Sequence, residues 1–520
     1  MASRCQPAAG EASEPGEPWS EALASARVER ARGWPIDLLA TVMIAAAVAL
    51  VFGHAFLNYD TFYALVWGSD LVAGRRPQYG VPYAPTPHPL AIAAGALLSP
   101  LGDAAEEALL AAGLLGLGAL AVGLFRLGQA VYAWPVGALA ALIVLTRVPY
   151  LSYGLRGYVD LPAAALVVWA AVLEARRPRR GAAVLVLLAL AGLLRPEVWL
   201  ASAGYWLWLL PGRGWTERLG LALLAACAPV LWLLGDGLVT GDPLWSLTGT
   251  SRLAERLERP TGLTALPAVV PFRLGEILRL PELVAGVIGF AGALALCRRR
   301  GTLLLVVVAG LNGVAIVAFA VAGLPLLGRY MFVAAAMIAV WSALAALGWT
   351  ALPAGHPVRP RARLVGLAVL VVLVVLSPFQ AVRLAELRAD IARRDAVAAD
   401  LRSLVTSPRA RAAMGRAGTV YLPTHRVTPG VAYWSGLRPG QVRSAAEQPA
   451  PGRGLFLAAA SPAATRLALL DPRDRTPAAP VPGNYGCPVA RNRSWVLLEP
   501  CGATDGADVR PTDRGEPPPG

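Results

Sequence analysis

Ionisable and aromatic side chains crowd residues 58–88, which directly follow the first strongly apolar run of the chain, residues 36–56. Asp60 stands near the start of this stretch, in Asn-Tyr-Asp-Thr-Phe-Tyr, and His88 stands at its end, in Pro-Thr-Pro-His-Pro. An acid beside a membrane-spanning run is costly unless it faces water or a partner. Asp60 is therefore a candidate functional carboxylate. Its alternative role is structural, because Asp is also a favoured N-cap for a helix that starts at Thr61.

Further charged residues recur at the ends of later apolar runs. They are Arg156 and Asp160, Arg195 and Glu197, and Arg329 with its neighbour Tyr330. A guanidinium group binds phosphate oxygens through two parallel hydrogen bonds, so the three arginines are candidate phosphate-binding residues. Alternatively, each arginine extends to the membrane interface beside an aromatic ring, as arginines at helix ends commonly do.

The remaining polar candidates have several open roles. Asp160, four residues after Arg156, could be a second acid, a metal ligand or the salt-bridge partner of that arginine. Glu197 is expected to cap the helix that begins beside it, since acids favour helix N-termini. His88 is held in an extended conformation between two prolines and could orient a phosphate or a sugar.

The composition is that of a polytopic membrane protein. Of the 520 residues, 56% are hydrophobic and 15% are charged, whereas soluble globular domains carry about 25% charged residues. Apolar runs of about 15 to 25 residues predict about eleven transmembrane helices. The predicted spans are 35–56, 104–125, 131–147, 160–175, 181–195, 197–211, 219–238, 283–297, 302–322, 329–350 and 363–378.

Arginine-rich loops orient these spans. Clusters at residues 27–32, 176–180, 298–300 and 359–363 fall on alternate loops, which the positive-inside rule assigns to the cytoplasm. The N-terminus is then cytoplasmic, and the loops with the candidate residues face outward across the plasma (inner) membrane. These loops account for the net charge of +14, so nucleic acid is not expected as a partner. The chain has no lysine and is rich in Ala, Gly, Pro and Arg, which indicates a GC-rich bacterial genome.

Four segments follow one another along the chain. They are a disordered cytoplasmic N-terminus (1–33), an all-α transmembrane domain (34–378), a small extracytoplasmic α/β domain (379–502) and a disordered tail (503–520). In the α/β domain, helical spacing over 381–404 precedes strand-like runs at 419–422, 454–458 and 494–498. Cys487 and Cys501 lie in one short polar region of this domain, and we expect them to form a disulfide outside the cytoplasm.

Taken in order, these motifs resemble the GT-C superfamily of integral-membrane glycosyltransferases over about residues 35–378. The resemblance rests on Asn58-Tyr-Asp60, Tyr83-Ala-Pro-Thr-Pro-His88-Pro, Gly157-Tyr-Val-Asp160, Leu194-Arg-Pro-Glu197 and Gly328-Arg-Tyr330. It implies transfer of a sugar from a polyprenyl-phosphate carrier to a cell-envelope glycan, lipid or protein. The first-loop acid, here Asp60, takes the role of general base. The expected substrate-binding residues are His88, Arg156, Asp160, Arg195, Glu197, Arg329 and Tyr330.

No cofactor is predicted from the sequence. The four histidines are dispersed, so no histidine metal cluster is expected, although a divalent metal ion held by other ligands stays open. The sequence has no P-loop and no strand-anchored Gly-x-Gly-x-x-Gly, which argues against a nucleotide-sugar donor.

Two other classes of protein share some of these features. A transporter or flippase of lipid-linked glycans would also be polytopic, but transporters tend to carry internal repeats with broken helices in matching positions, and we find no such repeat. The candidate acids also gather at one membrane face and not at the midplane. A non-catalytic membrane scaffold that binds glycan through its outer domain is the third alternative.

The arrangement of the arginine loops predicts the topology directly. We expect a cysteine introduced within residues 440–450 to react with a membrane-impermeant maleimide in intact cells, and one introduced within 176–180 to react only after permeabilisation. Labelling of the second site alone in intact cells would reverse the orientation.

Overall fold

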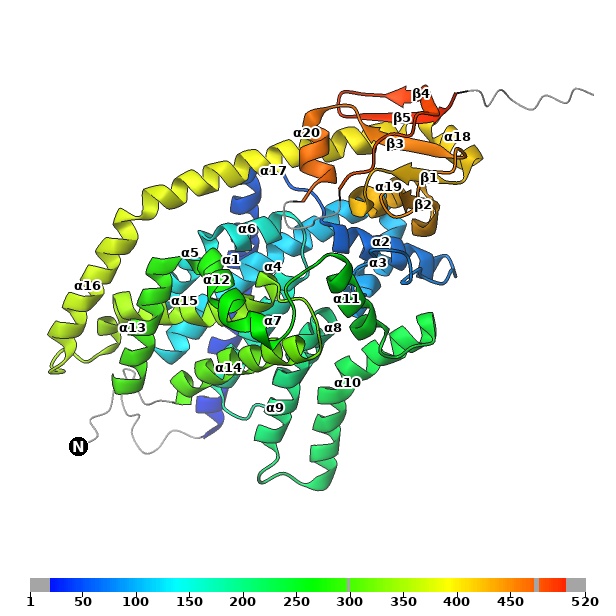
Figure 1. Cartoon of the computed structure of the whole chain (residues 1–520). Helices are drawn as coiled ribbons and strands as arrows, with labels where there is room; N and C mark the ends of the chain where they lie inside the picture. The colour runs from blue at the N-terminus through cyan, green and yellow to red at the C-terminus, as the bar shows by residue number, and fades with distance from the viewer. Residues whose placement is uncertain (1–18, 297–299, 472–476, 502–520) are drawn as a thin grey trace, which may run out of the picture. The chain divides into compact units, whose positions relative to one another are not determined.

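The structure of the chain is a computed structural model that describes residues 19–296, 300–471 and 477–501 (Figure 1). It divides into two compact units, a helical unit up to residue 396 and a C-terminal unit that begins at residue 397. The division falls within one long helix, α17 (Ser377–Thr406). The predicted disordered tail, residues 503–520, lies outside the described residues.

The helical unit is built from helices α1–α16 and the first part of α17. Their bounds are α1 Trp19–Phe52, α2 Tyr59–Val72, α3 Pro89–Leu98, α4 Ala104–Val131, α5 Trp134–Leu145, α6 Val148–Leu155, α7 Asp160–Arg176, α8 Ala182–Leu194, α9 Trp199–Leu209, α10 Trp215–Thr240, α11 Trp245–Arg256, α12 Leu266–Leu278, α13 Leu280–Leu296, α14 Arg300–Val321, α15 Phe332–Leu347 and α16 Arg359–Val375. Two short 3₁₀ turns, Pro196–Val198 and Gly328–Met331, precede α9 and α15.

The predicted apolar spans coincide with helices of this unit, which confirms an all-α polytopic fold. Within the described ranges, six helices are long and apolar enough to cross a membrane, or up to eight if each of two bent helix pairs is one span. Helices α8 and α9 have 13 and 11 residues, fewer than the roughly 20 that a helix needs to cross the hydrocarbon core. Some predicted spans are therefore helices shorter than a full crossing.

The first helix differs from the prediction at its start. The segment 1–33 was expected to be disordered, but α1 begins at Trp19. Residues 20–32 are rich in Ala, Glu and Arg, which have high intrinsic helix propensity, so the helix extends well beyond the apolar run. Residues 1–18 of this segment lie outside the described part of the chain.

Helices α4, α7 and α15 form the centre of the helical unit. Helix α4 packs on α1, α5 and α7, and α15 packs on α13 and α5. Leu117, Leu120 and Leu124 of α4 are fully buried in the resulting core. At Gly289 of α13, an added Cβ would lie 1.8 Å from the carbonyl oxygen of Trp341 in α15. Glycine therefore permits the close helix approach that is common between membrane helices.

Two short helices, α2 and α3, bracket the polar region 58–88. Gly68 and Gly95 each face the backbone of the other helix, and a Cβ on Gly95 would lie 2.3 Å from the carbonyl oxygen of Ala64. The two helices can therefore pack backbone to backbone. The apolar run 89–102, which is too short to cross a membrane alone, forms α3 and a following 3₁₀ turn.

Sharp bends interrupt two of the apolar helices. Helices α5 and α6 meet at 65°, and α12 and α13 meet at 102°. Arg279 lies at the second bend with φ +74° and ψ +160°, a conformation that essentially only glycine adopts without strain. Such a backbone costs about 1–3 kcal/mol and is retained only where the surrounding structure demands it.

The C-terminal unit has the predicted α/β fold, with a five-stranded mixed sheet of order β2-β1-β3-β5-β4 (Figure 1). The strands are β1 Val420–Leu422, β2 Val442–Ser444, β3 Leu455–Ala459, β4 Tyr485–Arg491 and β5 Trp495–Pro500, and the helices after α17 are α18 Pro408–Ala417, α19 Thr428–Ser435 and α20 Pro462–Ala464. Strand β1 pairs in parallel with β2 and β3, whereas β5 pairs antiparallel with β3 and β4. The three predicted strand runs correspond to β1, β3 and β5.

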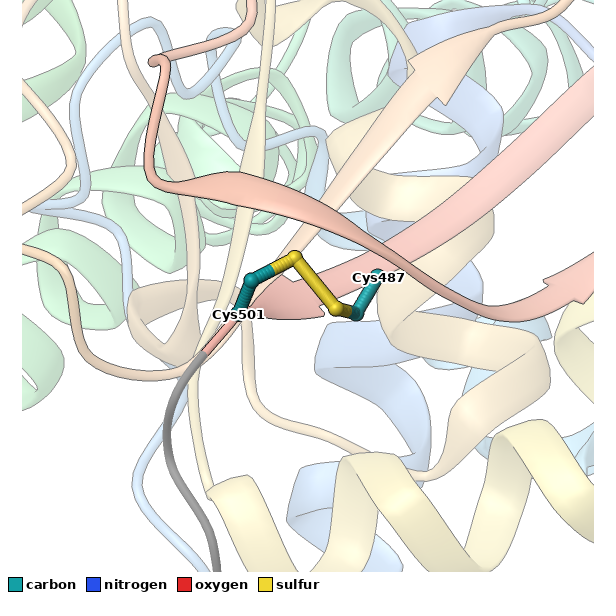
Figure 2. Close-up of a disulfide and its surroundings, with 2 residues drawn as sticks. All are labelled: Cys487 and Cys501. Atoms are coloured by element: carbon teal, nitrogen blue, oxygen red, sulfur yellow. A yellow bond between two sulfur atoms is a disulfide. The ribbon is translucent and has the colours of Figure 1, made fainter.

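A disulfide joins Cys487 of β4 to Cys501, the residue directly after β5 (Figure 2). The two Cα atoms are 5.3 Å apart, which lies within the usual range for bridged cysteines. The bond links β4, at the edge of the sheet, to the residue that follows its antiparallel neighbour β5.

We expect the disulfide to contribute measurably to the stability of the protein. Its sequence separation is 14 residues, and the chain-entropy model assigns about 3 kcal/mol to a loop of about 15 residues. The free energy of unfolding of the double variant Cys487→Ser/Cys501→Ser, measured by denaturant titration, should therefore be lower by roughly that amount. Mass spectrometry of non-reduced peptides from membranes checks the bond itself, and free thiols at both positions would contradict the pairing.

Candidate functional site

Asp60 lies in the first turn of α2, and Asn58 occupies the N-cap that was considered for it. The Asn58 side-chain oxygen accepts hydrogen bonds from the backbone N–H groups of Asp60 and Thr61. The Asn58 backbone and side-chain N–H groups both donate to the carbonyl of Arg156, at 2.9 and 2.8 Å. The Thr61 hydroxyl donates to the carbonyl of Gly157 at 2.8 Å. The start of α2 is thereby anchored to the turn between α6 and α7, which leaves the Asp60 carboxylate free for another role.

Arg329 holds the Asp60 carboxylate. It lies in the 3₁₀ turn before α15, its Nη1 donates to Asp60 Oδ2 at 2.7 Å, and both side chains are 17% exposed. Burial by itself raises the pKa of Asp60, but the charge and hydrogen bond of Arg329, with smaller contributions from His88 and Arg259, hold this pKa below its usual value. Asp60 is therefore ionised at neutral pH.

Arg195 joins two buried carboxylates in the turn between α8 and α9. Its Nη1 lies 3.2 Å from Asp160 Oδ1, and its Nε donates to Glu197 Oε1 at 2.9 Å. The three side chains are between 2% and 9% exposed. Such buried charges are stabilised only when they are paired, so this cluster must be kept together by the fold.

The Arg195 cluster excludes one of the open roles of Asp160 and corrects the expected role of Glu197. Asp160 pairs with Arg195 and not with Arg156, because the turn at Gly157, where φ is +63°, separates α6 from α7 and removes the helical spacing between positions 156 and 160. Glu197 pairs with Arg195 and makes no helix cap, since the cap positions of the 3₁₀ turn and of α9 are Arg195 and Val198.

Tyr330 lies between the two arginines. The guanidinium carbon of Arg195 is 4.5 Å from the centre of the Tyr330 ring, and that of Arg329 is 5.8 Å from it. Both distances suit a cation–π contact. Asn312 of α14 fixes this turn, because its side chain donates to the Tyr330 carbonyl at 2.9 Å and accepts from the Ala334 N–H at 3.2 Å.

His88 is a neutral member of the same cluster. It is 7% exposed and precedes α3. Burial and the positive charges of Arg195 and Arg329 lower the pKa of His88 to about 3, although Asp60 and a hydrogen bond with the Leu194 backbone act in the opposite direction. The imidazole therefore carries no charge at physiological pH and can only donate or accept hydrogen bonds.

Arg156 stands apart from the ion pairs of this cluster. Its guanidinium carbon lies 5.3 Å from the Phe56 ring centre and 5.1 Å from that of Tyr158. This arrangement matches the alternative in which an arginine rests beside aromatic rings. Its backbone contributes nonetheless, because the Arg156 carbonyl accepts the hydrogen bonds that anchor Asn58.

The fold brings four further residues to the cluster that the sequence did not single out. Tyr153 lies near both Arg329 and Asp160, Arg259 acts electrostatically on Asp60, and the Trp232 ring meets the His88 ring edge to face at 5.7 Å. Asn312, described above, is the fourth. Only Asn312 could have been found from the sequence, because it is an amide inside the apolar run 302–322 and polar residues within spans commonly have a function. Aromatic residues at spans carry no such signal.

Several buried polar atoms of the cluster make no hydrogen bond within the described part of the chain. They are His88 Nδ1, both Asp160 carboxylate oxygens, Arg195 Nη2, Glu197 Oε2 and Arg329 Nε. Buried polar atoms are normally hydrogen-bonded, so their concentration here marks a site with unused bonding capacity. No group of three or more His, Cys, Asp or Glu side chains that could hold a metal ion occurs among residues 19–296, 300–471 and 477–501.

This arrangement can perform two chemical tasks side by side. The Arg195 and Arg329 guanidinium groups offer N–H donors to an anion such as phosphate. The ionised Asp60 carboxylate, which directly contacts Arg329, can accept a proton. The neutral His88 adds a hydrogen-bonding group to the same cluster without adding charge.

Two solved structures share this fold. They are the crystal structures of ArnT from Cupriavidus metallidurans bound to undecaprenyl phosphate and in the apo state, with TM-scores of 0.52 and 0.50. They are 16% and 15% identical to this chain, and each comparison covers 90% of this chain and 98% of that chain. At these identities the likeness shows a shared fold, which agrees with the polytopic helical architecture expected from the sequence. No protein-family model and no curated protein sequence matches the chain.

The neutral state of His88 predicts a contribution to stability that depends on pH. Between pH 6.5 and 3 the unfolded chain binds a proton at this histidine and the folded chain does not, so the folded state loses stability as the pH falls. The loss amounts to about 2 kcal/mol at pH 5. In His88→Asn, the decrease in stability from pH 7 to pH 5 should shrink by about that amount. Thermal unfolding in detergent measures it, with the half-exposed His54→Asn as control; an equal change in both variants would contradict the assignment.

Proposed function

We propose that this chain is an integral-membrane glycosyltransferase. It moves a sugar from a polyprenyl-phosphate carrier to a glycan, lipid or protein of the cell envelope. The observation that supports this most is the contact between the ionised Asp60 and Arg329 in a buried cluster that also holds Arg195 and His88. The likeness of the fold to ArnT bound to undecaprenyl phosphate supports the same choice of donor.

Arg329 and Arg195 bind the donor phosphate in this proposal. When the bond between the anomeric carbon and the phosphate oxygen breaks, the departing polyprenyl phosphate gains one negative charge. Guanidinium groups placed at that position stabilise the transition state more than the ground state, which is the requirement for catalysis. Their contacts with the Tyr330 ring and with Asp60 and Asp160 hold both groups in place before substrate arrives.

Asp60 acts as the general base. The acceptor hydroxyl oxygen forms the new bond to the anomeric carbon, and its proton passes to an Asp60 carboxylate oxygen. The lowered pKa keeps Asp60 ionised but makes it a weak base while Arg329 pairs with it. When phosphate shares the Arg329 guanidinium, the carboxylate loses part of this partner and its pKa rises. Donor binding thereby prepares the base.

The active site faces the outer side of the plasma membrane in this proposal. Asp60 follows α1 by few residues, and the arginine-rich loops that the positive-inside rule assigns to the cytoplasm lie at the opposite ends of the apolar helices. The C-terminal unit, which begins at residue 397, is then extracytoplasmic, which agrees with the disulfide between Cys487 and Cys501.

The Asp60 carboxylate is the first group to test. Asp60→Asn keeps the size of the side chain and one hydrogen-bond acceptor for Arg329, but removes the charge and the basicity. We expect sugar transfer from a polyprenyl-phosphate donor to fall by about 10²–10⁴-fold, the usual contribution of a general base. Turnover is measured with purified protein in detergent or nanodiscs, and elution as a single species with a cooperative thermal transition shows that the variant is folded. Near-normal turnover would exclude the general-base role and make Asp160 the next acid to test.

A binding measurement separates a base from a residue that merely positions Arg329. If Asp60 is the base, Asp60→Asn lowers kcat and leaves the affinity for polyprenyl phosphate near that of the native protein. If Asp60 only holds Arg329, the affinity falls together with the rate. Arg329→Lys should weaken polyprenyl-phosphate binding, because an ammonium group cannot form the two parallel hydrogen bonds. Arg180→Lys, at an exposed arginine between α7 and α8, is the matched control and should leave both quantities unchanged.

A further inference from the structure

A charged cavity lies in the helical unit, and no residue of the cluster around Asp60 and Arg329 lines it. Its volume is about 570 Å³. It is formed where α6 begins, where α12 bends into α13, and along the first part of α17. The lining residues are Val148, Arg279, Arg383, Glu386, Leu387, Asp390 and Arg393.

Three of the residues that line this cavity are arginines, and two of them act on each other electrostatically. Arg279 is close enough to Arg383 and Arg147 that both positive charges act on it. Arg147 is buried and does not line the cavity, and it is neutralised by Glu282, whose Oε1 accepts from Arg147 Nη1 at 2.8 Å. Arg279 and Arg383 have no such carboxylate partner among the ion pairs of the described residues. These two guanidinium groups are therefore the ones available to an anion.

The carboxylates of the cavity do not cancel this charge. Asp390 is already paired, because its Oδ2 accepts from Arg394 Nε at 2.8 Å and its Oδ1 lies 3.8 Å from Arg393 Nη2. Glu386 is the remaining acid, and it is exposed at the cavity edge. The arginines around the cavity thus outnumber the carboxylates, and the excess lies at Arg279 and Arg383.

Two features of the arginines indicate a built site. Arg383 Nη1 is buried and makes no hydrogen bond within the described residues, so a donor of a lining arginine remains unused at the cavity. Arg279 is held in a backbone conformation suited to glycine, with φ +74°. A long charged side chain at such a position is strained, and strained residues concentrate at ligand-binding and functional sites.

The surface beside the cavity is apolar. Phe379 and Val382 of α17 are 68% and 58% exposed, and Leu280 and Val284 of α13 are 72% and 50% exposed. These residues belong to helices that are long and apolar enough to span a membrane, alone or as a bent pair. A ligand with a phosphate group and acyl chains therefore matches both the charged cavity and the apolar flanks, whereas a free anion matches only the cavity.

We propose that this cavity binds the phosphate of an anionic phospholipid headgroup, with Arg279 and Arg383 as its ligands and the acyl chains against the apolar residues of α13 and α17. Basic pockets between membrane helices commonly select lipids in this way. The site is separate from the Asp60 cluster and does not rest on the proposed transferase activity, because charge and exposed apolar surface define it.

The backbone at position 279 allows the lipid-binding role to be separated from folding. Arg279→Gly removes the guanidinium group but relieves the backbone strain, since glycine adopts positive φ freely. We expect this variant, without lipid, to unfold at the same temperature as the native protein or higher, and yet to bind dioctanoyl phosphatidylglycerol at least ten-fold more weakly. Arg383→Gln should weaken binding similarly. Arg388→Gln, at an exposed arginine of α17 that does not line the cavity, is the control and should bind as the native protein does.

The experiment uses delipidated full-length protein in detergent, with lipid binding followed by native mass spectrometry and by the shift in unfolding temperature. Phosphatidylglycerol should bind, whereas dioctanoyl phosphatidylcholine and glycerol 3-phosphate should bind at least ten-fold more weakly. Equal binding of phosphatidylcholine would overturn selection of an anionic headgroup. Equal binding of glycerol 3-phosphate would overturn the lipid as the source of the phosphate. Native-like binding by both Arg279→Gly and Arg383→Gln, or an equal loss in Arg388→Gln, would overturn the site itself.

Discussion

The ion pair between Asp60 and Arg329 is the contact on which the rest of the candidate site depends. It joins the first turn of α2 to the turn before α15, positions that are 269 residues apart in the chain. Both groups are largely buried, so removing either one would leave a charge without compensation, which typically costs several kcal/mol. The helices between these positions must therefore fold so that the two turns meet.

The residues of the cluster share one structural setting, because each lies at or near the end of an apolar helix. Asp60 follows α1, His88 precedes α3, Asp160 begins α7, and Arg195 and Arg329 lie in turns before α9 and α15. A charge in the middle of an apolar span has no solvent and few partners, whereas a helix end offers free backbone groups and opposite charges from neighbouring turns. The short helix α2, which carries Asp60 in its first turn, packs closely on α3.

The electrostatics of the cluster place two requirements in opposition. In the proposed mechanism, Arg329 must be cationic and close to bind phosphate, but the same charge lowers the pKa of Asp60 and makes it a weaker base. A ligand that draws on the Arg329 guanidinium relaxes this opposition, because the carboxylate then has less positive charge beside it. The buried, neutral His88 adds hydrogen-bonding capacity without disturbing that balance.

The sequence by itself determined the class of the protein and most positions of its polar cluster. Long apolar runs can only be buried or face lipid, so the helices were predictable, as were the residues at their ends and the strands β1, β3 and β5 of the C-terminal sheet. The partners within the cluster were decided by the tertiary structure. Spacing suggested that Asp160 pairs with Arg156, but the turn at Gly157 turns Asp160 toward Arg195 instead. Spacing reports only local geometry, whereas buried charges choose their partners among chain segments that packing brings together.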